Sequence, residues 1–257
     1  MPDLFTLPYI IQALLATLMT WSLTSLGAAL VLFTGKTPKT AMDGMLAFGA
    51  GVMLASAFWS LLRPAAEQAE ALAQPAWLVL CGGFLLGAFL PECGERLLIR
   101  AQHPSDSRRC RLLVTAITLH NIPEGLAVGM AFGACAAGAC TAAGAWMLAI
   151  CIGLQNSPEG AAVSLPLRRE GFSIRRAFMF GQLSGAVEPI AGLAGFLLAA
   201  QAASLLPFAL AFAAGAMITV AATDLIPESQ RSPHSALMTF STVLGFLVMT
   251  ALDLALG

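Results

Sequence analysis

The chain has 257 residues, of which 58% are hydrophobic and 11% are charged, and its net charge is −1. Soluble domains carry about 25% charged residues, so this composition excludes an ordinary soluble domain and predicts an integral membrane protein. The balanced charge, without a basic patch to contact phosphates, excludes nucleic acid as a partner.

Eight apolar stretches reach the roughly 20 residues that a membrane-spanning helix needs, and the segments between them are short. The first stretch is too long for the apolar part of a cleaved signal peptide. We therefore expect an all-α integral membrane protein with eight transmembrane helices, folded as a single transmembrane domain over residues 1–257. The expected helices cover residues 7–33, 41–62, 76–98, 112–134, 141–166, 177–200, 206–228 and 236–256.

The basic residues are biased to one side of these helices. Of the thirteen Lys and Arg residues, all except Arg63 lie in or beside the connections after the first, third, fifth and seventh helices. Loops rich in Lys and Arg stay in the cytoplasm. We therefore expect a multi-pass protein of a cell membrane, inner or plasma, with both termini outside the cytoplasm.

Three pairs of helices share short sequence patterns. Residues 47–54 (AFGAGVML) resemble 211–218 (AFAAGAMI), the triplet GFL occurs at 83–85 and 245–247, and the fourth and fifth helices share Asn-x-Pro-Glu-Gly. With eight helices, the members of each pair run in opposite directions. This predicts an inverted repeat of helices 1–3 and 6–8 around helices 4 and 5, an arrangement common in secondary transporters. Chance similarity of Ala- and Gly-rich helices is the alternative, which three coordinated pairs disfavour.

Two related polar motifs, HNIPEG at residues 120–125 and QNSPEG at 155–160, lie near the middle of apolar helices. Polar residues three and four apart share one helix face, and ionisable residues inside a membrane indicate a functional site. Glu188, before Pro189 in the sixth helix, is a third acidic candidate. Imidazole suits zinc, copper, iron and nickel, and carboxylate or carbonyl oxygen also suits manganese. The candidate ligands are His120, Asn121, Glu124, Gln155, Asn156, Glu159 and Glu188. The alternative, polar pairing between helices without a cation, would leave three costly carboxylates at the midplane.

Other polar residues are weaker candidates for lining a pathway. On the second helix, the candidates could line an outer entrance for the ion, but packing in the apolar core is favoured. On the third and seventh helices, the acidic candidates could form an exit route for a cation or could be ordinary charges at helix ends. These pathway candidates are Met53, Ser56, Ser60, Glu92, Glu95, Asp224 and Glu228. For Glu95 the interpretation as an ordinary helix-end charge is favoured. Asp43 and Asp253 are also expected to be helix-end charges.

No two of the six cysteines have CxxC spacing, so cysteine does not predict a zinc or redox motif. Cys135 and Cys140 flank a short turn and could form a disulfide in an oxidising space. Packing as two small buried residues is the interpretation that we favour.

The two motifs, together with GQLSG at 181–185, Glu188-Pro189 and DLIPE at 224–228, resemble the ZIP (Zrt/Irt-like) divalent metal transporter family, in its GufA-like branch. The resemblance covers essentially the whole chain. It implies eight helices with both termini outside, and uptake of zinc, cadmium, iron or manganese into the cytoplasm. It also implies frequent homodimers and an elevator-like movement of helices 1, 4, 5 and 6 that has been proposed for relatives.

The resemblance further implies a binuclear centre. One position would use His120, Glu124, Gln155 and Glu159; the other would use Asn121, Asn156 and Glu188, with Glu124 and Glu159 bridging. Several relatives carry Asp in place of Asn156, so the second position has one negative charge fewer here. Many relatives have a His-rich loop between the third and fourth helices, whereas the 100–111 loop holds only His103, which argues against metal sensing by that loop. Thr223 and Asp224 stand where some relatives have a His-acid pair.

We therefore expect a transporter that moves a divalent transition metal, zinc first, into the cytoplasm, with the bilayer and metal ions as partners and no resident cofactor. An intramembrane metal-dependent hydrolase is one alternative, which a single His in the spans disfavours because catalytic zinc commonly takes several His ligands. An ion channel is another, and saturable uptake with competition between metals would separate it from a carrier.

Overall fold

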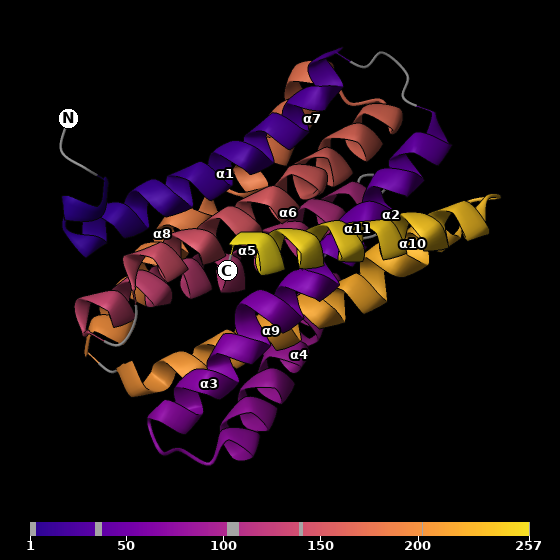
Figure 1. Ribbon diagram of the computed structural model, residues 1–257. Coiled ribbons are helices and arrows are strands. Elements are labelled where there is room, and N and C mark those ends of the chain that lie inside the picture. Colours follow the sequence, from indigo (N-terminus) through magenta and orange to yellow (C-terminus); the bar gives the residue numbers. More distant parts are fainter. Residues whose placement is uncertain (1–3, 34–37, 102–107, 139–140, 202, 257) are drawn as a thin grey trace.

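The computed structural model describes residues 4–33, 38–101, 108–138, 141–201 and 203–256; the side chains of residues 4, 90–101, 108–113, 115–117, 119–120, 201, 203 and 256 lie outside that description. Within it the chain is helical and has no strand (Figure 1). The α-helices are α1 (Tyr9–Phe33), α2 (Lys39–Ser56), α3 (Arg63–Ala71), α4 (Ala76–Ala101), α5 (Arg108–Ala136), α6 (Ala142–Arg169), α7 (Ile174–Ser184), α8 (Val187–Gln201), α9 (Leu206–Val220), α10 (Ile226–Gln230) and α11 (Ser235–Leu256).

In the described part of the chain these helices form eight long segments, as the apolar pattern predicts. Five segments are long and apolar enough to cross a membrane, namely Tyr9–Phe33, Lys39–Ala71, Ile174–Ala200, Leu206–Gln230 and Ser235–Ala255. The others, α4, α5 and α6, have 26, 29 and 28 residues. At about 1.5 Å per residue, each exceeds a hydrocarbon core of about 30 Å.

Two segments differ from their predicted outlines. The second continues to Ala71 through a π-helical turn, Ala57–Leu62, instead of ending at residue 62. Pro64, which has no N–H to donate to the preceding turn, follows this π-helical turn directly in the first turn of α3. The sixth segment is interrupted at Gly185 and Ala186, which separate α7 from α8.

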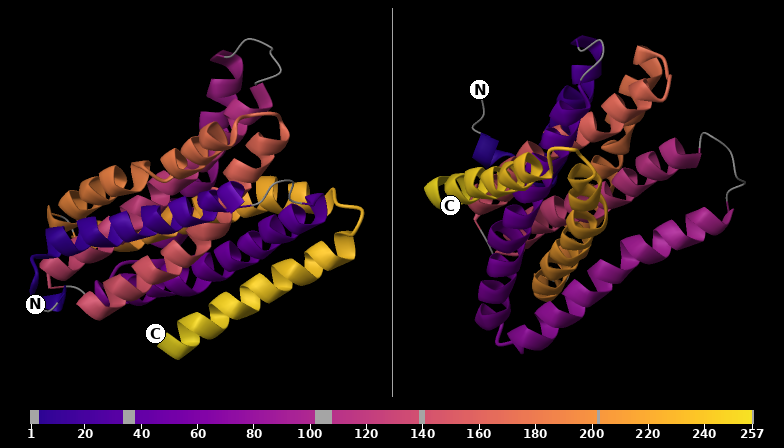
Figure 2. Two further views of the ribbon diagram at one scale, coloured as in Figure 1. Left: turned by 90° about the horizontal axis from the view of Figure 1, so that it is seen from above. Right: turned by 90° about the vertical axis from the view of Figure 1, so that its right-hand side faces the viewer.

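The packing of the helices has the symmetry expected of an inverted repeat. The most extensive contacts join α1 to α6, α5 to α8, α2 to α11 and α4 to α9; α11 follows α2 along one side of the bundle (Figures 1 and 2). Exchanging segments 1–3 with 6–8, and 4 with 5, converts the first pair into the second and the third into the fourth. The predicted repeat is therefore present in the structure.

A local feature repeats as well. The seventh segment contains a π-helical turn at Ala221–Leu225, which corresponds to Ala57–Leu62 in the second. The offset of 164 residues that superimposes sequence patterns 47–54 and 211–218 also places Ala57 on Ala221. Such turns are rare and frequently occur at functional sites.

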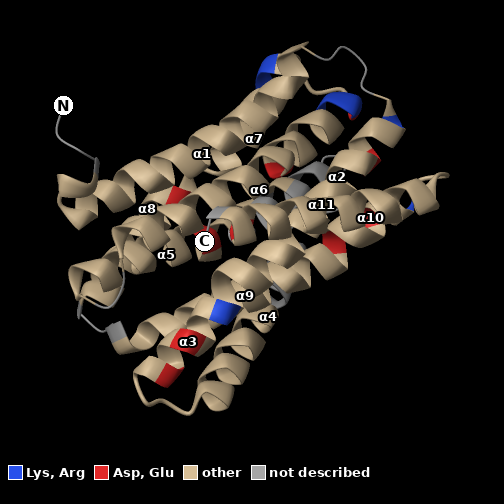
Figure 3. Cartoon of the chain, in the orientation of Figure 1, with Lys and Arg blue, Asp and Glu red and all other residues tan. Residues whose placement is uncertain are grey.

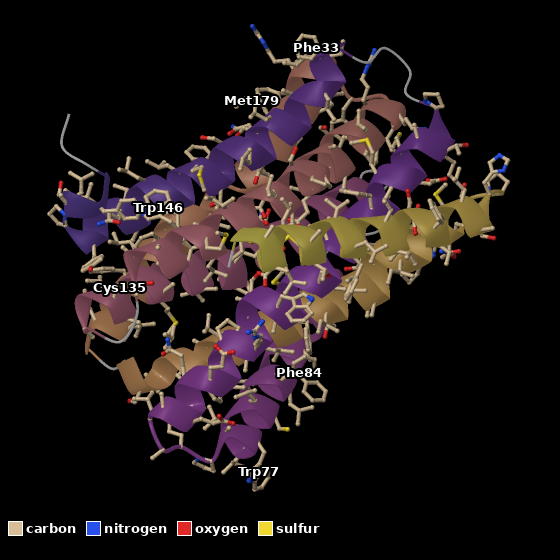
Figure 4. The ribbon with its side chains drawn as sticks, viewed as in Figure 1. Phe33, Trp77, Phe84, Cys135, Trp146 and Met179 are labelled. Carbon is tan, nitrogen blue, oxygen red and sulfur yellow. The ribbon has the colours of Figure 1, made fainter. Side chains whose placement is uncertain are left out.

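The two ends of the bundle differ in chemistry. Most of the Lys and Arg residues in Figure 3 gather at the end where α1 finishes and α2 begins, and an isolated basic residue lies near α3. Cys135 and Trp146 lie at the opposite end from Phe33 (Figure 4). Cys135 is disulfide-bonded, so the preference for simple packing is wrong for this residue, and Cys140 lies outside the described residues.

Candidate metal centre

The motif on α5 faces the motif on α6, as the sequence predicts. The Nε2 amide of Gln155 donates a hydrogen bond of 2.6 Å to Oε1 of Glu124. Both side chains are fully buried. Pro123 and Pro158 lie within these helices.

The break between α7 and α8 holds a third part of the site. The Nδ2 amide of Asn121 donates to the backbone carbonyl of Ser184, at 2.8 Å. Four residues further along, Glu188 lies in the first turn of α8, where the partial positive charge of a helix N-terminus favours a carboxylate. The fold thus brings Asn121 on α5 and Glu188 on α8 to the same break.

Helix α1 contributes residues that were not predicted from the sequence. The hydroxyl of Thr24 lies 3.2 Å from Oε1 of Glu188 and donates to it. Thr20 and Asn156 also lie beside this carboxylate. The threonines at 17, 20 and 24 are spaced to share one helix face, which is the sequence signal that could have identified them.

The three acidic side chains are buried together. Glu124 and Glu188 are fully buried and Glu159 is 4% exposed. Glu124 interacts electrostatically with both other carboxyls, and Glu159 with Glu188. Charges held this close in a low-dielectric interior repel strongly, so the ionised cluster requires a compensating cation.

In the described part of the chain, the centre contains buried oxygen atoms without a hydrogen-bond partner. They are Oδ1 of Asn121, Oε2 of Glu124, Oε1 of Gln155, Oδ1 of Asn156, Oε1 and Oε2 of Glu159, and Oε2 of Glu188. Buried polar atoms in proteins are nearly always paired. A divalent cation would satisfy these oxygens, because carboxylate and amide oxygens are ligands for such ions.

Four of these side chains have the same arrangement. Asn121, Glu124, Gln155 and Glu188 each have one polar atom held by a hydrogen bond from or to the protein and one free oxygen. Hydrogen bonds of this kind orient metal ligands. Glu159 differs, because neither of its carboxylate oxygens has a hydrogen-bond partner among the described residues.

His120 lies in α5, but its side chain is outside the described residues, so its part in the centre stays a prediction. Among the described His, Cys, Asp and Glu residues, no three lie close enough to hold a metal ion together.

The pathway candidates on the second segment have separate environments. Met53 belongs to the apolar core, which fits the favoured core stripe, whereas Ser56 is fully buried with an unpaired hydroxyl. Ser60 donates to Oδ1 of Asp253 at 3.0 Å. Asp253 thus joins α11 to the π-helical turn and is not an ordinary helix-end charge; Asp43, which is 4% exposed, is also more buried than expected.

The acidic exit candidates are only partly described. Glu228 forms an ion pair with Arg231, which fits the helix-end interpretation, and Asp224 lies half-buried in the π-helical turn. The side chains of Glu92 and Glu95 lie outside the described residues. The contacts described for Met53, Ser60 and Glu228 are with residues outside the candidate ligand set.

Comparison with known proteins gives an independent view of the same region. A family model described as "ZIP Zinc transporter" matches residues 100–253. The chain is 40% identical to "Zinc transporter ZIP11" of Xenopus tropicalis, over 96% of this chain and 98% of that protein. It is 35% identical to "Zinc transporter GufA" of Myxococcus xanthus, over 95% and 98%, and 35% identical to "Zinc transporter ZIPB" of Bordetella bronchiseptica, over 91% and 78%. The residues matched by the family model include Glu124, Glu159 and Glu188, the three acids of the centre.

Proposed function

Because the chain belongs to the ZIP zinc transporter family, we propose that this multi-pass membrane protein carries divalent transition-metal ions, zinc first, across the membrane. The family consists of transporters, so the intramembrane hydrolase considered from the sequence is excluded. Cadmium, iron and manganese are further substrates that the donor set would accept.

The observation that carries this proposal is the set of unpaired buried oxygens on α5, α6 and α8. We propose a binuclear centre in which His120, Glu124, Gln155 and Glu159 hold one ion. Asn121, Asn156 and Glu188 hold the second, and Glu124 and Glu159 bridge. The protein orients most of these ligands in advance, which limits the entropy that metal binding must overcome.

We also propose the direction and setting of transport. Residues 1–257 act as one transport domain in a cell membrane, inner or plasma, with both termini outside and metal moving into the cytoplasm. The clustering of Lys and Arg at one end of the bundle supports this orientation. The disulfide-bonded Cys135 at the other end also supports it, because disulfides persist in oxidising compartments. Homodimer formation remains a proposal from the family resemblance.

The test is zinc uptake into liposomes that contain the purified protein. Glu124→Ala removes a bridging ligand and the hydrogen-bond partner of Gln155, and we expect it to abolish uptake. Glu67→Ala is the matched control, because Glu67 pairs with Arg63 on the surface and should transport as the parent does. Undiminished zinc uptake by Glu124→Ala would refute the proposed centre. Saturation and competition by cadmium would distinguish a carrier from a channel.

A further inference from the structure

Helix α1 has a buried polar face. Gln12, Thr17, Thr20 and Thr24 are each fully buried, in a helix that is predominantly apolar. Polar side chains inside a membrane need partners. Thr17 finds its partners within its own helix, at the carbonyls of Ala13 and Leu14, so it needs no role beyond that.

Thr24 has a different environment. Its hydroxyl can also bond to its own helix, at the Thr20 carbonyl 3.2 Å away, but it lies equally close to Oε1 of Glu188. Thr20 lies beside the same carboxylate. The two threonines are four residues apart on one helix face, but the Thr20 hydroxyl donates to the Thr17 carbonyl at 2.9 Å. The direct hydrogen bond to Glu188 therefore comes from Thr24.

The close approach of α1 to the centre depends on glycine. A Cβ atom at Gly160 would lie 1.9 Å from the Thr24 carbonyl oxygen. At Gly185 it would lie 2.9 Å from Oε1 of Glu188 and 3.0 Å from the Thr24 hydroxyl. Gly160 and Gly185 therefore leave the space in which Thr24 and Glu188 can contact each other.

The contact with Thr24 makes the two oxygens of Glu188 unequal. Oε1 accepts from Thr24, whereas Oε2 is buried and has no hydrogen-bond partner among the described residues. A carboxylate held at one oxygen cannot rotate freely, so the other oxygen keeps a fixed direction. We propose that Thr24 is a positioning residue that holds Glu188 so that Oε2 binds the transported cation. This inference rests on the proposed function, because it assigns a role to Glu188 as a ligand.

The variant Thr24→Val tests this role in the liposome assay. Valine has nearly the shape of threonine but no hydroxyl. We expect this variant to raise the half-saturating zinc concentration by about tenfold, with a smaller change in the maximal rate. Thr24→Ser, which keeps the hydroxyl, should restore the parent value. Thr17→Val is the matched control, because that hydroxyl contacts only α1, and it should stay within about twofold of the parent.

A double-mutant cycle separates positioning from a general structural effect. In a Glu188→Gln background the hydroxyl has no carboxylate to orient, so adding Thr24→Val should cause little further loss of zinc affinity. Equal losses in both backgrounds, or parent-like uptake by Thr24→Val, would overturn the inference. These results are distinct from failure of the proposed function, which would appear as undiminished uptake by Glu124→Ala. Zinc binding to the purified variants, measured by calorimetry, gives the same comparison without transport.

Discussion

At the scale of single residues, Asn156 is the exception in the centre. Asn121, Glu124 and Glu188 each have one atom held by a short hydrogen bond, whereas the described residues provide no such bond to either amide atom of Asn156. The side chain of Asn156 lies beside the Glu188 carboxylate and interacts with it. A neutral side chain next to a carboxylate limits the negative charge at the second metal position.

Asn156→Asp should therefore tighten metal binding. The added carboxylate increases the attraction for a divalent cation, and we expect the zinc dissociation constant to fall at least tenfold, or about 1.4 kcal/mol. Without metal, the new charge repels Glu188 and lowers the thermal unfolding temperature, so zinc should raise that temperature more than it does in the parent chain.

Calorimetry and thermal unfolding of the purified variant measure these two effects. Asn156→Ala is the control for loss of the amide and should not tighten binding. An unchanged dissociation constant in Asn156→Asp would show that this position does not contact the ion.

At the scale of helices, glycines decide how closely the segments that hold the centre can approach. Gly160 packs against the backbone of α1 at Thr24, and Gly125 packs against the backbone of α8 at Glu188. A Cβ atom at Gly125 would lie 2.5 Å from the Glu188 carbonyl oxygen. Both glycines follow the Glu of their motif directly. The motif thus supplies a ligand and, one residue later, the space for the neighbouring helix.

Gly160→Ala should displace α1 from α6. The new methyl group would meet the Thr24 carbonyl at 1.9 Å, and overpacking of this kind costs about 1–3 kcal/mol. We expect a lower thermal unfolding temperature and reduced zinc uptake. Gly144→Ala, on the same helix, is the control, because its methyl group would meet only the Thr141 side chain, at 3.4 Å. Equal stability of the two variants would contradict the packing argument.

The sequence predicts the elements better than their contacts. Apolar length identifies the eight segments, and the spacing within the two motifs correctly predicts that Glu124 and Gln155 face each other. The π-helical turn at Ala57–Leu62 was not predicted, because its residues have ordinary helical spacing. The contact of Thr24 with Glu188 joins residues 164 positions apart, and it depends on packing that no local pattern encodes. Ser60 and Asp253 were missed for the same reason.

At the scale of the whole molecule, the centre belongs to one group of helices. The candidate ligands lie on α5, α6 and α8, and α1 holds Glu188, while α2 with α11 and α4 with α9 form two pairs outside this group. The two groups meet where α2 contacts α6 and where α5 contacts α9, which are equivalent contacts in the inverted repeat. This division corresponds to the elevator-like movement proposed for relatives, in which the helices that bind metal move together.

The direction of transport requires that the end rich in Lys and Arg faces the cytoplasm. Two exposed acidic residues mark the two ends: Glu170 follows α6 beside Arg168 and Arg169, and Glu67 lies on α3. We expect Glu67→Cys to react with a membrane-impermeant thiol reagent in intact cells. Glu170→Cys should react only after the membrane is permeabilised. Labelling of the parent chain gives the background from the native cysteines. The reverse labelling pattern would place both termini in the cytoplasm and would contradict the proposed orientation.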